Sequence, residues 1–170
     1  THVSLGIMNA HPDFFGRGVA RRLLKYITDF ADERSQPIRL VSSAMNLDSY
    51  SLYNRAGFVP RRIYHDMLLT VPESGMNVPP PPLSSSVREA TLEDAQAIAD
   101  LEMELVHIRR EGDFRHFIEN RDGWWGVSVL EDEHGRIQGF LASIRHEASN
   151  ILGPGVMRTE EQAIALLYAE

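Results

Sequence analysis

The chain has 170 residues, of which 43% are hydrophobic, enough for one globular domain or two partial ones. The net charge of −7 argues against a nucleic-acid partner, since proteins that bind nucleic acid neutralise phosphates with clustered Lys and Arg. The absence of cysteine excludes disulfides, thiolate metal sites and Cys nucleophiles, and it fits a cytoplasmic protein. No apolar run reaches the roughly 18 residues of a membrane span, so we expect no membrane partner.

The first seventy residues predict alternating strands and helices. Apolar residues at alternate positions predict a strand at 3–10. A short strand is expected at 38–41, and two further strands, divided near Tyr64, are expected in 58–71. Apolar residues at three- and four-residue spacings predict amphipathic helices at 18–33 and 48–56. Gly57 stands where a left-handed residue would end the second helix.

A run of four prolines, Pro79 to Pro82, separates this part from the rest and is followed by Ser84 to Ser86. Prolines in series favour an extended conformation, and a Ser run is flexible, so 74–86 is interpreted as a linker between domains. The alternative is a proline-rich ligand for another domain.

After the linker a second set of elements begins. The pattern predicts a strand at 87–90, a helix from Thr91 to about His107, a shorter helix at 114–120, a hairpin of 124–132 with 136–144, and a strand at 150–156. Thr159 to Gln162 form a capping box that starts a last helix. Trp124 and Trp125 would point to opposite faces of their strand, which favours core packing over a joint stacking platform.

The segment from Phe15 to Ala20 lies between a predicted strand and a predicted helix, and its chemistry is that of an anion site. The first amides of a helix have no internal partner, and Gly16 and Gly18 would let a phosphate approach the backbone. Cations crowd the first two turns, namely Arg17, Arg21, Arg22 and Lys25. The alternative is that the glycines serve the geometry of the turn alone. The segment is neither a dinucleotide fingerprint nor a P-loop, because the third glycine and the Lys-Ser/Thr step are missing.

Two blocks of this sequence resemble the GNAT N-acetyltransferase superfamily. Residues 10–24 follow motif A, in which a strand runs into Gln/Arg-x-x-Gly-x-Gly/Ala and a helix. Residues 46–58 match the block Asn-x-x-Ser/Ala-x-x-Leu-Tyr-x-x-x-Gly-Phe. The resemblance implies an α/β (α+β) fold with a mixed, mostly antiparallel sheet flanked by helices.

The resemblance also implies a coenzyme A site and a role for each matching residue. The backbone of Phe15, Gly16, Arg17, Gly18, Val19 and Ala20 would hold the pyrophosphate, and Met8, Ala10 and Asn46 would contact the pantetheine arm. Tyr53 would be the general acid that protonates the leaving thiolate; its alternative is a ring packed on the apolar face of its helix. Phe15 departs from the family, which has Gln or Arg there, so we expect weakened affinity for the coenzyme.

No general base is identified by the sequence. His11 and Ser4 lie on or near the first strand, and neither is assigned this role. Seven His residues lack the spacing of metal ligands, so no metal is expected.

The order of the halves is unusual for the family that the chain resembles. Residues 1–73 resemble the C-terminal half of a GNAT domain, and 87–170 resemble the N-terminal part of a second, degenerate one. A chain that opens on Thr1 and closes inside a helical pattern at Glu170 suggests a fragment of a tandem-GNAT protein. The alternative is that the halves complement each other, within one chain or by exchange between two.

Three functions follow from these expectations. The leading hypothesis is an acyl-CoA dependent, most simply acetyl-CoA dependent, N-acyltransferase whose acceptor is a small-molecule or peptide amine. A second is a non-catalytic module that binds coenzyme A for regulation, and a third is a purely structural pair of domains. Residues 150–169 look like a second copy of the strand and helix of the site, without its glycine step and with two Glu at the helix start, so a second coenzyme site is doubtful.

Overall fold

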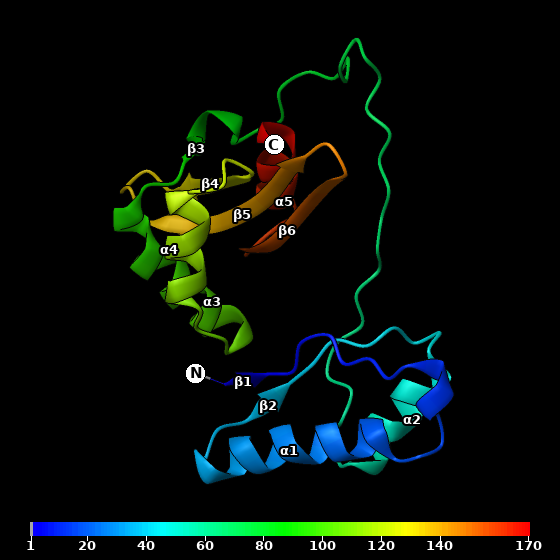
Figure 1. Ribbon diagram of the computed structural model, residues 1–170. Helices are drawn as coiled ribbons and strands as arrows, with labels where there is room; N and C mark the ends of the chain where they lie inside the picture. Colours follow the sequence, from blue (N-terminus) through cyan, green and yellow to red (C-terminus); the bar gives the residue numbers. More distant parts are fainter. Residues whose placement is uncertain (1) are drawn as a thin grey trace. The chain divides into compact units, whose positions relative to one another are not determined.

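A computed structural model of the chain describes residues 2–170. The chain divides into two compact units, Thr1–Val71 and Pro72–Glu170, which are taken separately below as unit 1 and unit 2 (Figure 1). Within the described residues, no helix combines the length and the apolar character that crossing a membrane would need.

Unit 1 is built around a strand, helix, strand element. Strand β1 (Val3–Ser4) pairs in parallel with β2 (Ile38–Arg39), and helix α1 (Val19–Glu33) connects the two. The short 3-10 helix η1 (Pro12–Phe14) precedes α1, and helix α2 (Leu47–Arg55) follows β2. The apolar stripe of α1 buries Leu24 and Ala31, and Val3 is buried with them. Both predicted helices are confirmed, and Gly57 follows α2 with a φ of +92° as expected.

Two strand predictions in unit 1 are wrong. The expected strand at 3–10 ends at Ser4, and the segment 58–71 contains no strand. A strand is stabilised by its ladder of hydrogen bonds, and the part of the chain that the structure describes provides β1 with one short partner. Apolar side chains along 58–71 therefore stay in solvent: Leu68 is 97% exposed and Met67 is 91% exposed.

Unit 2 contains a four-stranded antiparallel sheet in the order β3-β4-β5-β6. Its strands are β3 (Val87–Glu89), β4 (Trp125–Glu131), β5 (Ile137–His146) and β6 (Ser149–Met157). Its α-helices are α3 (Ala95–Val106), α4 (Glu111–Glu119) and α5 (Glu160–Ala169), with 3-10 turns η2 (Ser84–Ser86) and η3 (Leu92–Asp94). These elements confirm the order expected from the sequence.

Helices cover both faces of this sheet (Figure 1). Successive strand residues point to opposite faces, so Val129 and Phe140 join the core under α3 and α4, while Leu130 and Leu141 join a smaller cluster under α5. Phe114 of α4 is fully buried. Its ring lies edge-on to that of Phe140 at 4.9 Å between centroids.

The two tryptophans are separated as expected. The Trp125 ring stacks on Phe117 with 4.0 Å between centroids, whereas Trp124 lies edge-on to His146 and is 48% exposed. The expected packing in the core is therefore found for Trp125 and not for Trp124.

Arg88 of β3 links η3, the 3-10 turn before α3, to strand β4 through two carboxylates. Its guanidinium makes two hydrogen bonds to the carboxylate of Asp94, at 2.7 and 2.9 Å, and one of 2.5 Å to Glu131. Asp94 also closes the capping box of Thr91, whose amide donates to it at 2.7 Å. The hydrogen bonds from Arg88 and, to a smaller extent, those from Thr91 lower the pKa of Asp94 from 3.8 to about 2.

We expect unit 2 to lose stability in acid through Asp94. Because the folded-state pKa is lowered, the contribution of Asp94 is complete above its unfolded value near pH 4 and is lost as the pH falls towards about 2. After allowance for solvent screening the loss is about 1 kcal/mol. Urea unfolding of the wild type and of Asp94→Asn, between pH 7 and pH 2.5, measures this loss. The free energy of unfolding of the variant should be lower at pH 7 and should decrease less as the pH falls. Asp122→Asn, at an exposed carboxylate, should follow the wild type; equal slopes for Asp94→Asn and wild type would contradict the assignment.

Candidate functional site

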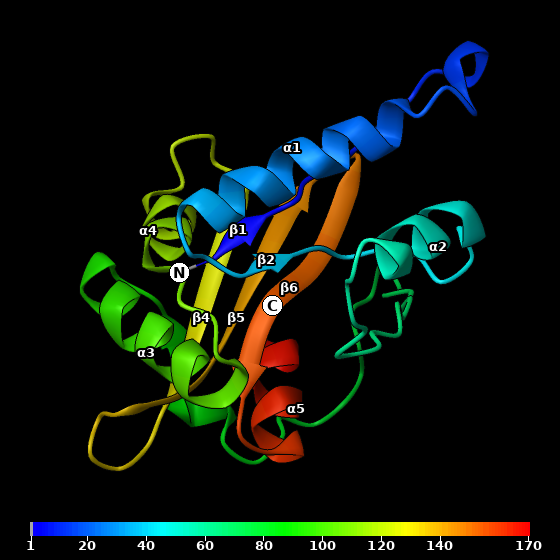
Figure 2. The ribbon, with the colours of Figure 1, turned by 90° about the horizontal axis from the view of Figure 1, so that it is seen from below.

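The loop before α1 adopts the conformation that the glycine spacing predicts. His11 caps η1 through Nδ1, which accepts from the amide of Asp13 at 3.3 Å. Gly16 and Gly18 then take φ values of +73° and +76°, which other residues rarely adopt. A Cβ added at either glycine would meet no atom within 4 Å. The loop projects from the N-terminal end of α1 (Figure 2), and the space over its glycines is open.

Several amides at this turn have no acceptor. The first hydrogen bond of α1 runs from the amide of Arg22 to the carbonyl of Gly18, at 3.0 Å. Within residues 2–170, no acceptor is found for the amides of Gly16 and Gly18 or for those of the first helical turn, Val19 to Arg21. Such amides, together with the positive end of the helix dipole, form a site for an anion.

The start of α1 differs in charge from the start of α2. Asn46 caps α2, with Oδ1 accepting from the amide of Ser49 at 3.1 Å, and an acidic residue occupies the first turn. Helix α1 has neither a side-chain cap nor an acid in its first turn. It places Arg21 and Arg22 there instead, which is unfavourable for a bare helix and favourable for one that holds an anion.

One of the four predicted cations is already neutralised. Lys25 makes an ion pair with Asp29 at 2.7 Å, one helical turn further on, and the Lys-x-x-x-Asp spacing in the sequence would have shown this. The guanidinium of Arg17 lies 5.2 Å from the centre of the Phe14 ring. Arg21 and Arg22 are exposed and have no carboxylate partner among residues 2–170. The candidate anion site thus comprises backbone amides with Arg17, Arg21 and Arg22, and Lys25 does not belong to it.

Met8 and Ala10 lie in the extended stretch between β1 and the loop. Both are half-buried, and neither belongs to a strand. Phe15, at the departure from the family pattern, is 67% exposed, and its amide donates to the carbonyl of Pro12 at 3.0 Å. An extended ligand could therefore add to the backbone at Met8 and Ala10, as another strand would.

Tyr53 lies on α2 and is half-buried. Its ring packs edge-on against Phe58, with 5.9 Å between centroids, so the packing expected from the alternative interpretation is present. Its hydroxyl makes no hydrogen bond within the described residues, which leaves the proton of the phenol available to a ligand.

At the corresponding helix start in unit 2, that of α5, side chains of the same segment already accept hydrogen bonds from the amides. Gln162 Oε1 accepts from the amides of Arg158 and Thr159, and Thr159 Oγ1 accepts from the amide of Gln162. The guanidinium of Arg158 is held by Glu104 at 2.6 and 2.7 Å, and Glu160 and Glu161 fill the first turn. Unit 2 therefore offers no anion site at α5.

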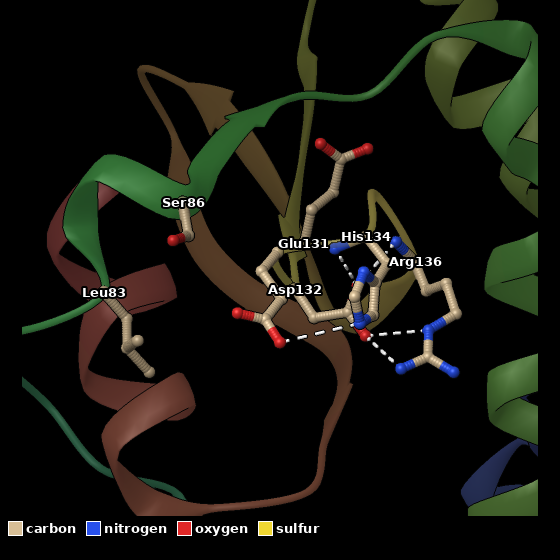
Figure 3. A pocket seen from close by; sticks show the side chains of 7 residues that line it. Leu83, Ser86, Glu131, Asp132, His134 and Arg136 are labelled. Atoms are coloured by element: carbon tan, nitrogen blue, oxygen red, sulfur yellow. Dashed lines mark hydrogen bonds and ion pairs between the residues drawn. The ribbon is translucent and has the colours of Figure 1, made fainter.

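A surface hollow lies elsewhere in unit 2, between η2 and the β4–β5 hairpin (Figure 3). Asp132 accepts from the amide of His134 and from the Arg136 guanidinium, both at 2.9 Å. Hydrogen bonds from Arg136, led by its backbone amide, hold the pKa of Asp132 at about 2. A carboxylate bound in this way is a poor base, and none of the predicted site residues lines this hollow.

Part of the chain is similar in sequence to a known family. Residues 1–58 match the sequence model of the acetyltransferase (GNAT) family. The match covers 58 of the 170 residues and lies within unit 1. This segment contains every residue predicted for the site, from Met8 to Tyr53. Among curated proteins no sequence matches the chain.

Solved structures share the GNAT fold with the chain. A GCN5-related N-acetyltransferase from Kribbella flavida is 14% identical with a TM-score of 0.52, over 98% of this chain and 42% of its own. One from Sphaerobacter thermophilus is 18% identical with a TM-score of 0.51, over 94% of this chain and 56% of its own. The fold expected from the sequence is confirmed, and this chain spans about half the length of these structures.

Proposed function

We propose that the chain binds acetyl-CoA and transfers its acyl group to an amine. The observation that carries this proposal is the row of unpartnered amides at Gly16 and 18–21, beside exposed arginines and within the segment that matches the sequence model of the acetyltransferase (GNAT) family. The diphosphate of the coenzyme supplies the two adjacent anionic groups that such a turn accommodates. The pantetheine arm would then run along Met8 and Ala10 and past Asn46.

The proposed reaction is direct transfer. The amine nitrogen forms a bond to the thioester carbonyl carbon, and the tetrahedral intermediate collapses as the carbon–sulfur bond breaks. The amine loses a proton to water, the departing thiolate accepts one from the Tyr53 hydroxyl, and the Tyr53 phenolate regains a proton from water. The products are an N-acyl amine and the free thiol of coenzyme A. The acceptor in this proposal is a small-molecule or peptide amine.

Calorimetric titration with acetyl-CoA tests the site. Gly18→Asn should weaken binding at least about tenfold, since Asn tolerates positive φ but its side chain fills the space that the diphosphate needs. We expect one coenzyme per chain, because the turn before α5 is closed.

Gly57→Asn is the matched control. Gly57 also has a positive φ and open space around it, but it ends α2 and belongs to no part of the proposed site. This variant should bind like the wild type. Equal affinities of Gly18→Asn and wild type, or no heat with the wild type, would overturn the proposed coenzyme site.

A second candidate function is a coenzyme-binding module without catalysis. Phe15 favours it, because this residue replaces a side-chain donor with an exposed ring. Such a module would bind acetyl-CoA and release no thiol in the presence of amines.

We also propose that the chain derives from a tandem arrangement of GNAT domains. Both solved structures align with nearly the whole chain, while they use about half of their own length. The short β1 and the exposed apolar side chains of 58–71 would then be covered by further chain, or by a second copy that exchanges half-domains. Light scattering of the isolated chain separates the two, because exchange requires a dimer.

A further inference from the structure

A buried carboxylate lies at the C-terminal end of α5. The side chain of Glu170, the residue that follows the helix, is 0% exposed. Its Oε1 accepts a hydrogen bond from Ser128 Oγ at 2.6 Å, and its Oε2 accepts from Ser143 Oγ and, at 2.8 Å, from the Arg145 guanidinium. Burial raises the pKa of this carboxyl group, but the three hydrogen bonds outweigh burial and hold the pKa below its usual value. The group is therefore an ion at neutral pH.

The three donors belong to the sheet and not to the helix. Ser128 lies on β4, and Ser143 and Arg145 lie on β5. The two strands pair so that Ser143 lies opposite Gly126 and Ser128 lies opposite Leu141. Alternate residues of β5 share a face, so Ser143 and Arg145 lie on the same face as Leu141, which packs under α5. The positions of the donors are therefore set by strand register and do not depend on the carboxylate.

Gly126 leaves the space in which the guanidinium lies. A Cβ at this position would stand 2.7 Å from Nη2 of Arg145 and 2.8 Å from Oγ of Ser143. Both distances are shorter than a van der Waals contact, so a residue with a side chain would displace these donors. The φ of Gly126 is not in the left-handed region, so the backbone conformation does not require glycine here. The close approach of the donors accounts for it.

A carboxylate is the group that these donors fit. Ser128 and Ser143 are 8% and 2% exposed, so their hydroxyls have little access to water and need an acceptor. The Arg145 guanidinium adds a positive charge, and hydrogen bonds from a charged donor to a carboxylate are stronger than those between neutral groups. The Arg145 side chain is 59% exposed, so the cluster borders solvent on that side.

We infer that Ser128, Ser143 and Arg145 form a carboxylate-binding site and that Glu170 occupies it as an internal ligand, fixing the end of α5 on the sheet. Because the donors are built into the sheet, a free small carboxylate binds in their midst once the Glu170 side chain is removed. The substitution Glu170→Ala deletes a methylene and a carboxylate, which together have the shape of acetate. The site lies in unit 2, and the inference does not rest on the proposed coenzyme site.

Thermal unfolding of the full chain tests the inference through the fluorescence of the two tryptophans, which both belong to unit 2. Glu170→Ala should lower the unfolding midpoint by about 5–10 °C, because three donors lose their acceptor. Acetate at roughly 0.1 M should then raise the midpoint of this variant by about 3–5 °C more than the same concentration of chloride, since a ligand that binds only the folded form stabilises it. Acetamide, which has the shape without the charge, should raise it less. The wild type should respond equally to acetate and chloride.

Two further variants separate the site from a general effect of salt. The double variant Glu170→Ala/Ser143→Ala lacks one donor and should lose most of the gain from acetate. Glu161→Ala deletes an exposed carboxylate from the same helix and should respond equally to both salts.

Three results would overturn the inference. They are a Glu170→Ala variant that gains no more from acetate than from chloride, a wild type that gains as much as this variant, and a gain that is undiminished without Ser143. Should Glu170→Ala be unfolded in chloride, recovery of the folded tryptophan signal in acetate is the expected result, and its absence counts against the site in the same way.

Discussion

Replacement of Tyr53 by Phe is expected to lower the turnover number about 10²- to 10⁴-fold, the contribution of one general acid. The substitution removes only the hydroxyl, so the edge-on packing of the ring against Phe58 is kept and the fold is unaffected. Affinity for acetyl-CoA should stay within about twofold of the wild type, because the contacts proposed for the diphosphate are backbone amides at Gly16 and 18–21, which the substitution does not change. Release of thiol from acetyl-CoA, followed with a panel of small and peptide amines, measures the loss.

Tyr50→Phe is the matched control for this experiment. Tyr50 lies on the same helix, one turn before Tyr53, and is 41% exposed. Its variant should turn over like the wild type. Wild-type turnover by Tyr53→Phe would exclude the acid role, and a wild-type chain that binds acetyl-CoA but releases no thiol would favour the non-catalytic module.

The second large effect concerns the stability of unit 2. Arg110→Ala is expected to reduce the free energy of unfolding by about 3–5 kcal/mol, because it leaves a buried carboxylate without its counter-ion. Glu102 of α3 is 1% exposed, and its Oε1 accepts two hydrogen bonds from Arg110, one of them 3.0 Å from Nε. No partner for Oε2 is found in the described part of the chain, so Arg110 alone balances this charge.

Urea unfolding measures this loss through tryptophan fluorescence. Both tryptophans belong to unit 2, so their emission reports on that unit alone. The double variant Glu102→Leu/Arg110→Ala removes the charge and its partner, and it should recover most of the loss. Arg121→Ala breaks a more exposed pair with Glu119 and should cost less than about 1 kcal/mol. A double variant as unstable as Arg110→Ala would show that lost packing, and not the buried charge, is responsible.

Local patterns in the sequence predicted the elements that depend on local interactions. Helix α1 occupies 19–33 where 18–33 was expected, and Thr159 and Gln162 form the capping box that their spacing indicates. Gly16 and Gly18 take the positive φ values that a phosphate-binding turn requires. These features are fixed within a few residues of the chain, where helix periodicity, caps and glycine conformations are decided.

Features that depend on distant residues could not be predicted in the same way. Residues 3–10 alternate in the manner of a strand and 58–71 are rich in apolar residues, but a strand needs a neighbour to hydrogen-bond with, and neither pattern supplies one. The pairing of Glu102 with Arg110 joins two helices across a turn, and nothing in the spacing distinguishes it from a solvated pair. Within the site, the number of arginines can be read from the sequence. The structure shows which of them have no carboxylate partner among the described residues.

The small core of unit 1 gives the coenzyme a second importance. Among the described residues of unit 1, the buried apolar side chains are Val3, Leu24 and Ala31, against a far larger set in unit 2. A domain with so little buried surface opens readily, and any ligand that binds only the closed form adds to its stability in proportion to the logarithm of ligand concentration. The metabolic supply of acyl donor would then govern how long this part of the polypeptide survives cellular proteases, quite apart from any group it transfers.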